Sequence, residues 1–251
     1  MSSKVLIQKE KMVAALQKKN LLPQKLPENI IFLYQSSVMK KVREKYKTER
    51  QPFFIGDLDI VNSNLGVISR LGIGAPSLAL FFEKAISLGA KKFISIGTCG
   101  SLDPLFKIRD FVIVQKAYCD EGTSLHYNKK TRESAASSSA LFSAVSEKAK
   151  SNQRQLKPAQ AWTTDAFYRE TEDRREVFRG LGCSVVDMEA SAFYSLAEFH
   201  KAEALALFVV SDELSSHDWA PQFSGLNSEI MALFELTVES IHGQIMSSKS
   251  K

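Results

Sequence analysis

The sequence predicts one α/β domain whose central sheet is covered on both faces by helices. Short apolar stretches alternate along the chain with longer amphipathic stretches, which is the pattern of strands separated by helices. The apolar stretches contain few polar positions, as strands buried on both faces of a sheet do. A length of 251 residues is enough for a single large core.

The predicted strands are short runs rich in β-branched and aromatic residues, and the third of them ends at Gly97. In the predicted helices apolar residues recur at helical spacing, as Leu78, Phe81 and Ala85 do. Functional groups gather at the carboxyl ends of the strands in such sheets. The predicted strands span residues 30–34, 66–69, 92–96, 111–114, 185–186 and 204–210, and the predicted helices span residues 38–46, 76–88, 140–149, 189–200 and 227–245.

The composition is that of an ordinary globular protein, with 44% hydrophobic and 24% charged residues. The net charge is +5, but lysines and arginines are interspersed with acids, and even the densest basic run, residues 40–47, contains Glu44. We therefore expect a solvated helix face there and no nucleic-acid partner. No apolar run approaches membrane-spanning length and residues 1–20 lack an apolar signal core, so we expect no membrane partner and a cytoplasmic location.

The three cysteines form no framework of disulfides, because none lies in a CxxC pair and their number is odd. Cys99 follows a predicted strand, but no histidine lies near it in the sequence. We interpret it as a small packing residue rather than as a nucleophile. The chain also lacks a cluster of metal-ligand residues, so we expect no metal and no cofactor.

Two glycine-containing turns follow predicted strands. The first, residues 72–77, precedes a helix, where backbone amides and the helix dipole favour an anion. Ser77 replaces the third glycine of a dinucleotide-binding motif, and no Gly-Lys-Ser/Thr follows as in a P-loop. The second, residues 96–101, places Thr98 close to two glycines. For each turn the alternative is a tight connection without a ligand.

Carboxylates follow two further strands. Asp187 and Glu189 flank Met188 at a strand-to-helix junction, where a carboxylate can accept two hydrogen bonds from a sugar diol. Asp212 follows Ser211 at the end of an apolar strand, where burial favours a protonated acid that can donate its proton. The structural alternatives are an acid at a helix amino end and a helix N-cap.

Taken in order, these segments resemble the nucleoside phosphorylase superfamily, which contains hexameric purine nucleoside phosphorylases, uridine phosphorylases and related nucleosidases. The resemblance covers residues 66–214 and rests on the segments GIGAPS, IGTCG, EGTSLHY, TTDAFY, VVDMEASA and VVSD. It implies a single domain with a twisted, partly closed central sheet, here residues 29–251, preceded by a helical extension over residues 1–28. It also implies a homo-oligomer, a dimer or hexamer, in which neighbouring chains complete each site.

The resemblance implies a role for each candidate residue. The expected activity is cleavage of the bond between ribose and base, with phosphate as co-substrate and no other cofactor. Positive charge builds on the sugar and negative charge on the base, so an acid at the base and an anion near the sugar both help. Glu189 and Met188 would bind ribose, Phe167 would stack on the base beside Cys99 and Gly100, Thr98 and Gly72 would contact phosphate, and Asp212, after Ser211, would protonate a purine at its imidazole nitrogen.

Two observations favour a purine. Uridine phosphorylases follow the Phe-Tyr pair with a Gln and an Arg that read uracil, and this chain has Thr171 and Asp173 at those offsets. Uridine phosphorylases also lack the Ser-Asp pair found at Ser211 and Asp212. The segment EGTSLHY, in contrast, resembles the uridine-type branch.

The chain departs from the family at the phosphate site. The first loop normally carries an arginine, but here it is residues 34–38, without one, and Ser95 stands where a second arginine is usual. Arg70, just before Gly72, and Arg50, near the position of an arginine lent to a neighbouring subunit, are possible replacements; surface or ion-pair roles are the alternatives. No arginine follows Arg179, so Asp212 would act alone or with His217.

Three hypotheses therefore stay open. The first is a phosphorylase with a rebuilt phosphate site. The second is a nucleosidase that uses water, which the first loop disfavours because it offers no Glu as base. The third is a non-catalytic nucleoside-binding homologue, against which the retention of Glu189 and Asp212 argues, since binding alone needs no acid.

Overall fold

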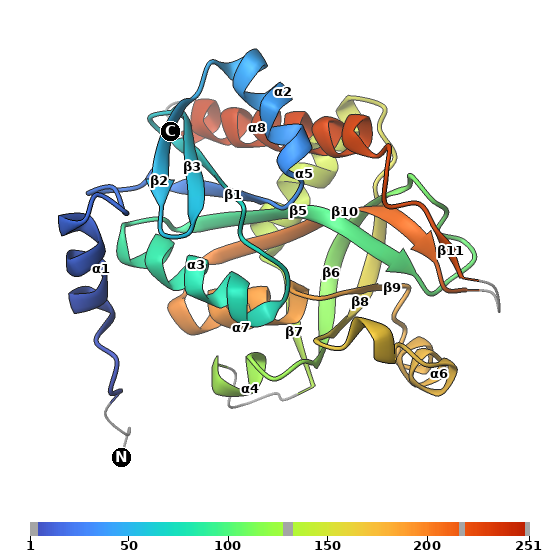
Figure 1. Cartoon of the computed structure of the whole chain (residues 1–251). Coiled ribbons are helices and arrows are strands. Elements are labelled where there is room, and N and C mark those ends of the chain that lie inside the picture. The colour runs from blue at the N-terminus through green and yellow to red at the C-terminus, as the bar shows by residue number, and fades with distance from the viewer. Residues whose placement is uncertain (1–4, 128–132, 216–218, 249–251) are drawn as a thin grey trace.

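The computed structural model describes residues 5–127, 133–215 and 219–248, and its strands form one mixed sheet. Figure 1 shows this sheet running through the middle of the molecule. The strands are β1 (Asn29–Leu33), β2 (Glu49–Phe53), β3 (Gly56–Asn62), β4 (Leu65–Ser69), β5 (Lys92–Ser101), β6 (Phe111–Asp120), β7 (Ser134–Ala136), β8 (Lys157–Thr164), β9 (Val185–Asp187), β10 (Glu203–Glu213) and β11 (Ala220–Pro221).

The sheet closes on itself over part of its width. The strands follow the order β11-β10-β6-β8-β9-β5-β1-β4-β3-β2, and β10 also pairs with β5. Strands β5, β10, β6, β8 and β9 thus form a closed ring, from which β1, β4, β3 and β2 extend as an open wing (Figure 1). This arrangement confirms the predicted α/β domain with a twisted, partly closed sheet.

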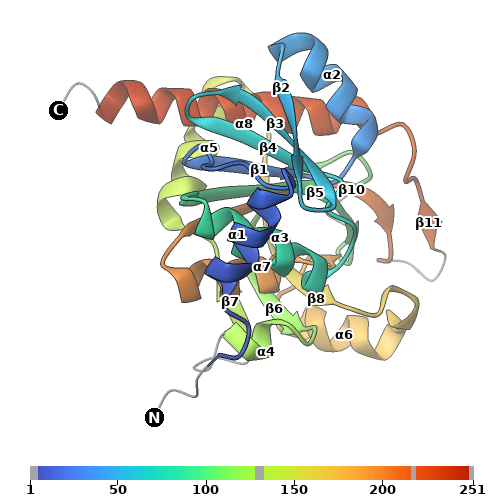
Figure 2. The same ribbon diagram turned by 60° about the vertical axis from the view of Figure 1, so that its left-hand side comes forward.

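Helices cover both faces of the sheet. In Figure 1, α2, α5 and α8 lie above the sheet, whereas α3 and α7 lie below it; Figure 2 shows the same two layers from another side. The helices are α1 (Lys9–Lys18), α2 (Ser36–Tyr46), α3 (Ala75–Ser87), α4 (Ser124–Tyr127), α5 (Ser139–Ser151), α6 (Glu172–Gly180), α7 (Ala190–His200) and α8 (Asn227–Ser248), with a 3₁₀ turn, η1 (Phe167–Arg169).

Successive side chains of β1 pack alternately into two hydrophobic clusters, one on each face of the sheet. Ile30 and Phe32 belong to the cluster under α3 and α7, whereas Ile31 and Leu33 belong to the cluster under α2, α5 and α8. Successive side chains of a strand point to opposite faces, so an all-apolar strand fits only a sheet buried on both sides.

The strands and helices predicted from the sequence are all present, but three strands are longer than predicted: β6 continues to Asp120, β10 to Glu213 and β5 to Ser101. Strand β5 does not end at Gly97 but continues to Ser101, because it pairs with β10 as far as Ser101 and with β9 at Gly100 and Ser101. The second glycine-containing segment is therefore part of a strand and not a turn after it.

Several elements escaped prediction because their sequences are polar or contain proline. Pro52 lies in β2, which is an edge strand where a missing amide is tolerated. Strand β3 carries two acids, yet Asp57 and Asp59 are buried, and each is paired with an arginine. Pro158 interrupts the apolar pattern of β8. Strands β2, β3 and β4 pair with their neighbours in the sequence, so it was the polar residues and Pro52 that hid β2 and β3. Strand β8 pairs with β6 and β9, which lie further away along the chain.

Part of the proposed N-terminal extension is a helix. Helix α1 lies against α3, and its Val13 belongs to the apolar cluster under α3 and α7. Among the described residues, no helix has both the length and the apolar character that crossing a bilayer requires.

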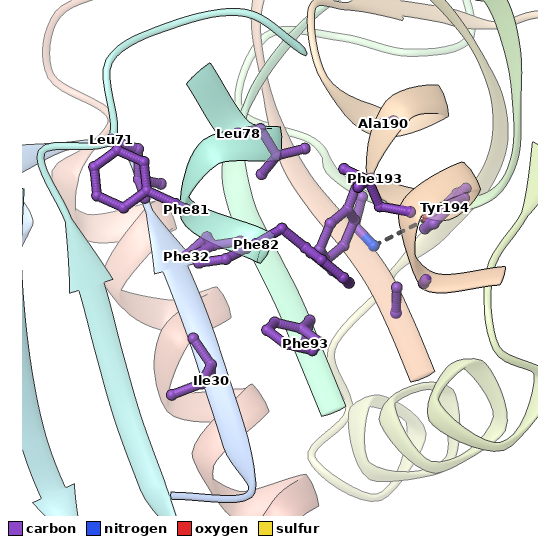
Figure 3. Close-up of a cluster of buried hydrophobic side chains, with 14 of the residues drawn as sticks. Ile30, Phe32, Leu71, Leu78, Phe81, Phe82, Phe93, Ala190, Phe193 and Tyr194 are labelled. Carbon is purple, nitrogen blue, oxygen red and sulfur yellow. Dashed lines mark hydrogen bonds between the residues drawn. The ribbon is translucent and has the colours of Figure 1, made fainter. Parts of the chain in front are cut away.

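Aromatic side chains form the centre of the core under α3 and α7. Figure 3 shows Phe82 of α3 lying between Phe32, Phe93 and Phe193. The Phe82 ring stacks on Phe93 with centroids 4.2 Å apart and meets Phe193 edge-on at 5.9 Å. Such pairs add to the free energy gained by burial of the rings.

Phe82→Ala tests this packing. It removes a fully buried ring, and we expect the free energy of unfolding to fall by about 3–5 kcal/mol. Leu80→Ala, in the same helix but half exposed, is the control and should change it by no more than about 0.5 kcal/mol. Denaturant unfolding of both variants measures the free energy of unfolding. If both variants lost the same amount, the assignment of Phe82 to the core would be wrong.

Candidate active site

A cavity of about 780 Å³ lies where β1, β4, β5, β9 and β10 end. The segments that line it come from six parts of the chain. They are residues 34–36 after β1, residues 70–73 after β4, residues 97–100 within β5, Phe167 and Glu170 around η1, residues 186–189 after β9, and Phe208, Ser211, Asp212 and Phe223 on or after β10. Folding thus brings together residues that are as much as 189 positions apart.

The cavity gathers nearly all the residues that the sequence analysis selected. Arg50 is the exception, because it does not line the cavity. The residues that do are Arg70, Gly72, Thr98, Cys99, Gly100, Phe167, Met188, Glu189, Ser211 and Asp212. Their roles there stay predictions.

An irregularity in β10 sets the position of Asp212. The register between β10 and β5 shifts between Val210 and Asp212, and such bulges redirect side chains. Both oxygens of the buried Asp212 carboxylate accept a hydrogen bond. The Ser211 hydroxyl donates to Oδ1 at 2.8 Å, and the Trp219 indole N–H donates to Oδ2 at 3.0 Å.

Gly100 allows the Asp212 carboxylate to lie against β5. A Cβ atom at position 100 would be 2.5 Å from the Leu214 side chain, 2.9 Å from that of Val186 and 3.2 Å from Asp212 Oδ2. Any side chain there would displace these neighbours. The glycine is thus required by close packing at the acid, which the sequence alone did not show.

The two acids beside Met188 have different roles. The Asp187 carboxylate accepts hydrogen bonds from the Thr163 hydroxyl at 2.6 Å and from the Ala190 amide at 2.6 Å, so it caps the amino end of α7. Glu189 Oε1 instead accepts from the Gly74 amide at 2.5 Å, across the cavity in the loop before α3. The helix-cap alternative therefore describes Asp187, whereas Glu189 extends along the cavity wall.

Burial shifts Glu189 and Asp187 toward their protonated forms. Desolvation, with a contribution from Asp187, raises the pKa of Glu189 to about 8. Burial also raises the pKa of Asp187 to about 6, although hydrogen bonds oppose that shift. A ligand that brings hydroxyl donors or positive charge would favour the ionised forms.

Glu170 is a cavity acid that the sequence analysis missed. It follows η1 and lies three residues after Phe167. The positions compared with the base-reading residues of uridine phosphorylases were Thr171 and Asp173, which come after it. Burial and the nearby charges of Asp212 and Asp187 raise the pKa of Glu170 to about 8. Its position two residues after the Phe-Tyr pair was the available signal.

Three aromatic rings gather at the same end of the cavity. Phe167 lies 6.3 Å from Trp219 and 6.4 Å from Phe223, measured between ring centroids, and Trp219 lies 6.0 Å from Phe223. Trp219 and Phe223 were also missed, because they flank the two-residue strand β11, which has no pattern of its own. An aromatic face suits stacking against a planar ligand.

The opposite end of the cavity favours an anion. Gln35 and Ser36 mark the amino end of α2, and the residues before Gly74 mark that of α3, so two helix dipoles point their positive ends here. Arg70 also lines this end and has a left-handed backbone, with φ of 60°. Arg70 and Arg50 share the Asp57 carboxylate, at 3.6 Å and 2.8 Å respectively.

Tyr34 adds a hydroxyl to the cavity wall. Its oxygen is buried and has no hydrogen-bond partner within normal distance among the described residues. Burial, with Glu189 contributing, raises the pKa of this hydroxyl well above its usual range. Tyr34 is thus a neutral hydroxyl in the cavity wall, with Ser95 beside it.

Other candidates are inert or structural. Burial raises the pKa of the Cys99 thiol, which agrees with its interpretation as a packing residue. Glu121, in the polar stretch 120–127, accepts hydrogen bonds from the Ser124 amide and the Ser191 hydroxyl, away from the cavity wall. The described residues include no group of three acids, histidines or cysteines that could hold a metal. His217 lies outside the described residues.

Glu170→Gln tests the protonation of that acid. The folded chain holds its proton up to about pH 8, whereas the unfolded chain releases it near 4.5, so Glu170 lowers stability as pH rises through this window. We expect the glutamine variant to melt at a higher temperature than the parent at pH 8 and at the same temperature near pH 4.5. The exposed acid Glu44, replaced by Gln, should show no such dependence; a Glu170→Gln difference independent of pH would contradict the shift.

Comparison with known proteins places this geometry in a family. The family model described as Phosphorylase superfamily matches residues 31–234. A DeoD-type purine nucleoside phosphorylase from Buchnera aphidicola subsp. Schizaphis graminum is 31% identical over 190 residues, which cover 70% of this chain and 80% of that protein. One from Exiguobacterium sibiricum is 34% identical over 149 residues, covering 59% of this chain and 63% of that protein, less than two thirds of its length.

Solved structures share the fold at lower identity. An AMP nucleosidase from Bacteroides thetaiotaomicron aligns with a TM-score of 0.79 and 18% identity, covering 97% of this chain and all of that one. A purine nucleoside phosphorylase from Toxoplasma gondii, in complex with immucillin-H, aligns with a TM-score of 0.72 and 21% identity, covering 88% and 93%. The family model covers most of the chain, and the chain therefore belongs to the phosphorylase superfamily, the nucleoside phosphorylase family that its motifs resemble.

Proposed function

We propose that this protein is a nucleoside phosphorylase that cleaves the N-glycosidic bond of a purine nucleoside with phosphate, giving the free base and ribose 1-phosphate. The observation that carries the proposal is the placement of Glu189, Asp212, Phe167 and Arg70 in the wall of one cavity. These residue types fit a ribose, a base and an anion bound together there.

Each residue type suits its part of the reaction. Asp212, hydrogen-bonded by Ser211, would protonate the leaving base, and Phe167 would stack against it beside Cys99 and Gly100. Glu189 would accept the ribose hydroxyls, with Met188 against the sugar. Carboxylates near the ring also stabilise the positive charge that develops on the sugar as the bond breaks. We propose that no metal or other cofactor takes part.

Phosphate is the proposed nucleophile because the far end of the cavity favours an anion. Gly72, Thr98 and Arg70 line it beside the amino ends of two helices. Relatives that are about a third identical carry the name purine nucleoside phosphorylase, which also supports a purine. The Tyr34 hydroxyl is a further possible contact for the anion or the sugar.

Hydrolysis is the second candidate. Structural neighbours include an AMP nucleosidase and a futalosine hydrolase, and Arg70 is the single arginine among the described residues that line the cavity. A phosphate site with fewer arginines would bind phosphate weakly and leave room for water. We favour phosphate because residues 34–36 offer no carboxylate to activate water.

We propose that copies of the chain assemble as a homo-oligomer, a dimer or hexamer, in which Arg50 serves a neighbouring cavity. Its guanidinium pairs with Asp57, outside the cavity of its own chain, and its side chain is 52% exposed. An exposed arginine held in place by a buried acid is suited to contact an anion in another subunit.

Release of base from inosine, guanosine, adenosine, methylthioadenosine and uridine, with and without phosphate, tests the reaction. We expect phosphate-dependent cleavage of the purine nucleosides. Asp212→Asn should lower kcat by roughly 10²- to 10⁴-fold, because an amide cannot donate the acid's proton, while nucleoside binding persists. Cleavage without phosphate would indicate a hydrolase, and binding without any cleavage would indicate a non-catalytic homologue.

Arg70→Ala tests the anion end. Loss of a charged contact should raise KM for phosphate by roughly 10- to 100-fold with a smaller change in KM for the nucleoside. If a neighbouring chain completes the site, Arg50→Ala should also raise KM for phosphate. If it does not, that KM should stay unchanged. Lys40→Ala, which removes a positive charge from an exposed position of α2, is the control. An unchanged KM for phosphate in Arg70→Ala would remove that residue from the site.

A further inference from the structure

Trp219 lies beside the proposed acid, Asp212. Its indole N–H donates to Asp212 Oδ2 at 3.0 Å. The backbone around it is tied to the same strand, because β11 pairs with β10 at Asp212 and Pro221, and the Gln222 amide donates to the Ser211 carbonyl at 2.7 Å. The backbone beside Trp219 is thus held by the sheet, and the half-exposed Trp219 side chain itself makes the contact with Asp212.

The donors to Asp212 are neutral. Within the described part of the chain, its carboxylate accepts from the Ser211 hydroxyl and the Trp219 indole, and no lysine, arginine or histidine forms an ion pair with it. A neutral N–H fixes the direction of a carboxylate without adding a full positive charge that would oppose protonation. Both donors therefore orient the Asp212 carboxylate without an ion pair.

The same indole contacts the aromatic rings at the base end of the cavity. Trp219 lies within 6.3 Å of both Phe167 and Phe223, and Phe167 lines the cavity next to Asp212. A planar base that stacks on Phe167 would therefore meet a ring cluster that is connected to the acid through a hydrogen bond.

We propose that Trp219 is a positioning residue, which orients the Asp212 carboxyl toward the bound base through its indole N–H and couples this orientation to the aromatic cluster of Phe167 and Phe223. It acts through Asp212 and does not itself exchange a proton. The proposal rests on the proposed function, since it assumes that Asp212 is the acid.

Several titratable groups surround Asp212 and would contribute to any pH profile. Glu170 approaches from η1, Asp187 and Glu189 from the junction of β9 and α7, and Cys99 from β5. A single variant therefore cannot be interpreted alone. Two substitutions at position 219 that change the donor in opposite ways leave all four groups in place.

Trp219→Phe and Trp219→Arg form this pair. Phenylalanine keeps a ring but removes the N–H, so the ionised acid loses support and the alkaline limb of the kcat profile should move up by about one pH unit. Arginine supplies a charged donor and should move the limb down. We expect kcat at neutral pH to fall about tenfold in Trp219→Phe, with a smaller change in KM, because the acid is less well oriented.

The outcomes separate this inference from the proposed function. Opposite shifts of the limb support positioning by Trp219. If both variants are active and keep the pH profile and kcat of the parent, the inference about Trp219 is wrong, while the phosphorylase assignment stands. Failure of the parent enzyme to release any base would instead overturn the proposed function, and with it the role of Asp212.

Tryptophan fluorescence gives a second readout that does not require turnover. The chain contains two tryptophans, and the indole of the buried Trp162 donates to Asp120 instead of Asp212. The difference in emission between the parent and Trp219→Phe reports Trp219 together with any effect on Trp162, which lines the same smaller cavity. We expect this difference to titrate with pH and the transition to disappear in Asp212→Asn; a transition that survives in Asp212→Asn would contradict the hydrogen bond.

Discussion

The parallel pairing of β10 with β5 is the interaction on which the site depends. It closes the ring of strands and brings Asp212 opposite Gly100, where the absence of a side chain leaves space for the carboxylate. The shift of register after Val210 directs Ser211 and Asp212 to the cavity. Closure of the sheet and placement of the acid are thus consequences of one register, and a slip of one residue would turn both side chains to the other face.

The cavity concentrates acidic groups in a weakly solvated space. Burial and mutual repulsion raise the pKa of Glu170 and Glu189 to about 8 and that of Asp187 to about 6. Desolvation is the largest cause in each case, so the protein itself disfavours the charged forms. In the proposed reaction, a ribose ring that gains positive charge would favour the ionised forms.

The part of the cavity proposed to bind an anion differs from the pattern expected for the family. Where the family places arginines in the first loop and at the start of the strand exit, this chain has residues 34–38 and Ser95. Two helix amino ends and Arg70, anchored by Asp57, occupy that part of the cavity instead. At the acid end, the donors to Asp212 are the neutral Ser211 hydroxyl and the Trp219 indole. Arg70 is the single arginine among the described residues that line the cavity.

The sequence by itself determined the fold class, the family and most of the cavity wall, because apolar strands and the motifs around Gly72, Gly100, Glu189 and Asp212 are local patterns. Only the tertiary structure decided what those residues contact. Asp187 became a helix cap, Glu189 reached Gly74, and Arg50 and Arg70 met at Asp57 through pairings between distant strands. Glu170, Trp219 and Phe223 joined the site without a pattern of their own, since burial and hydrogen bonding depend on neighbours that the chain supplies only when it is folded.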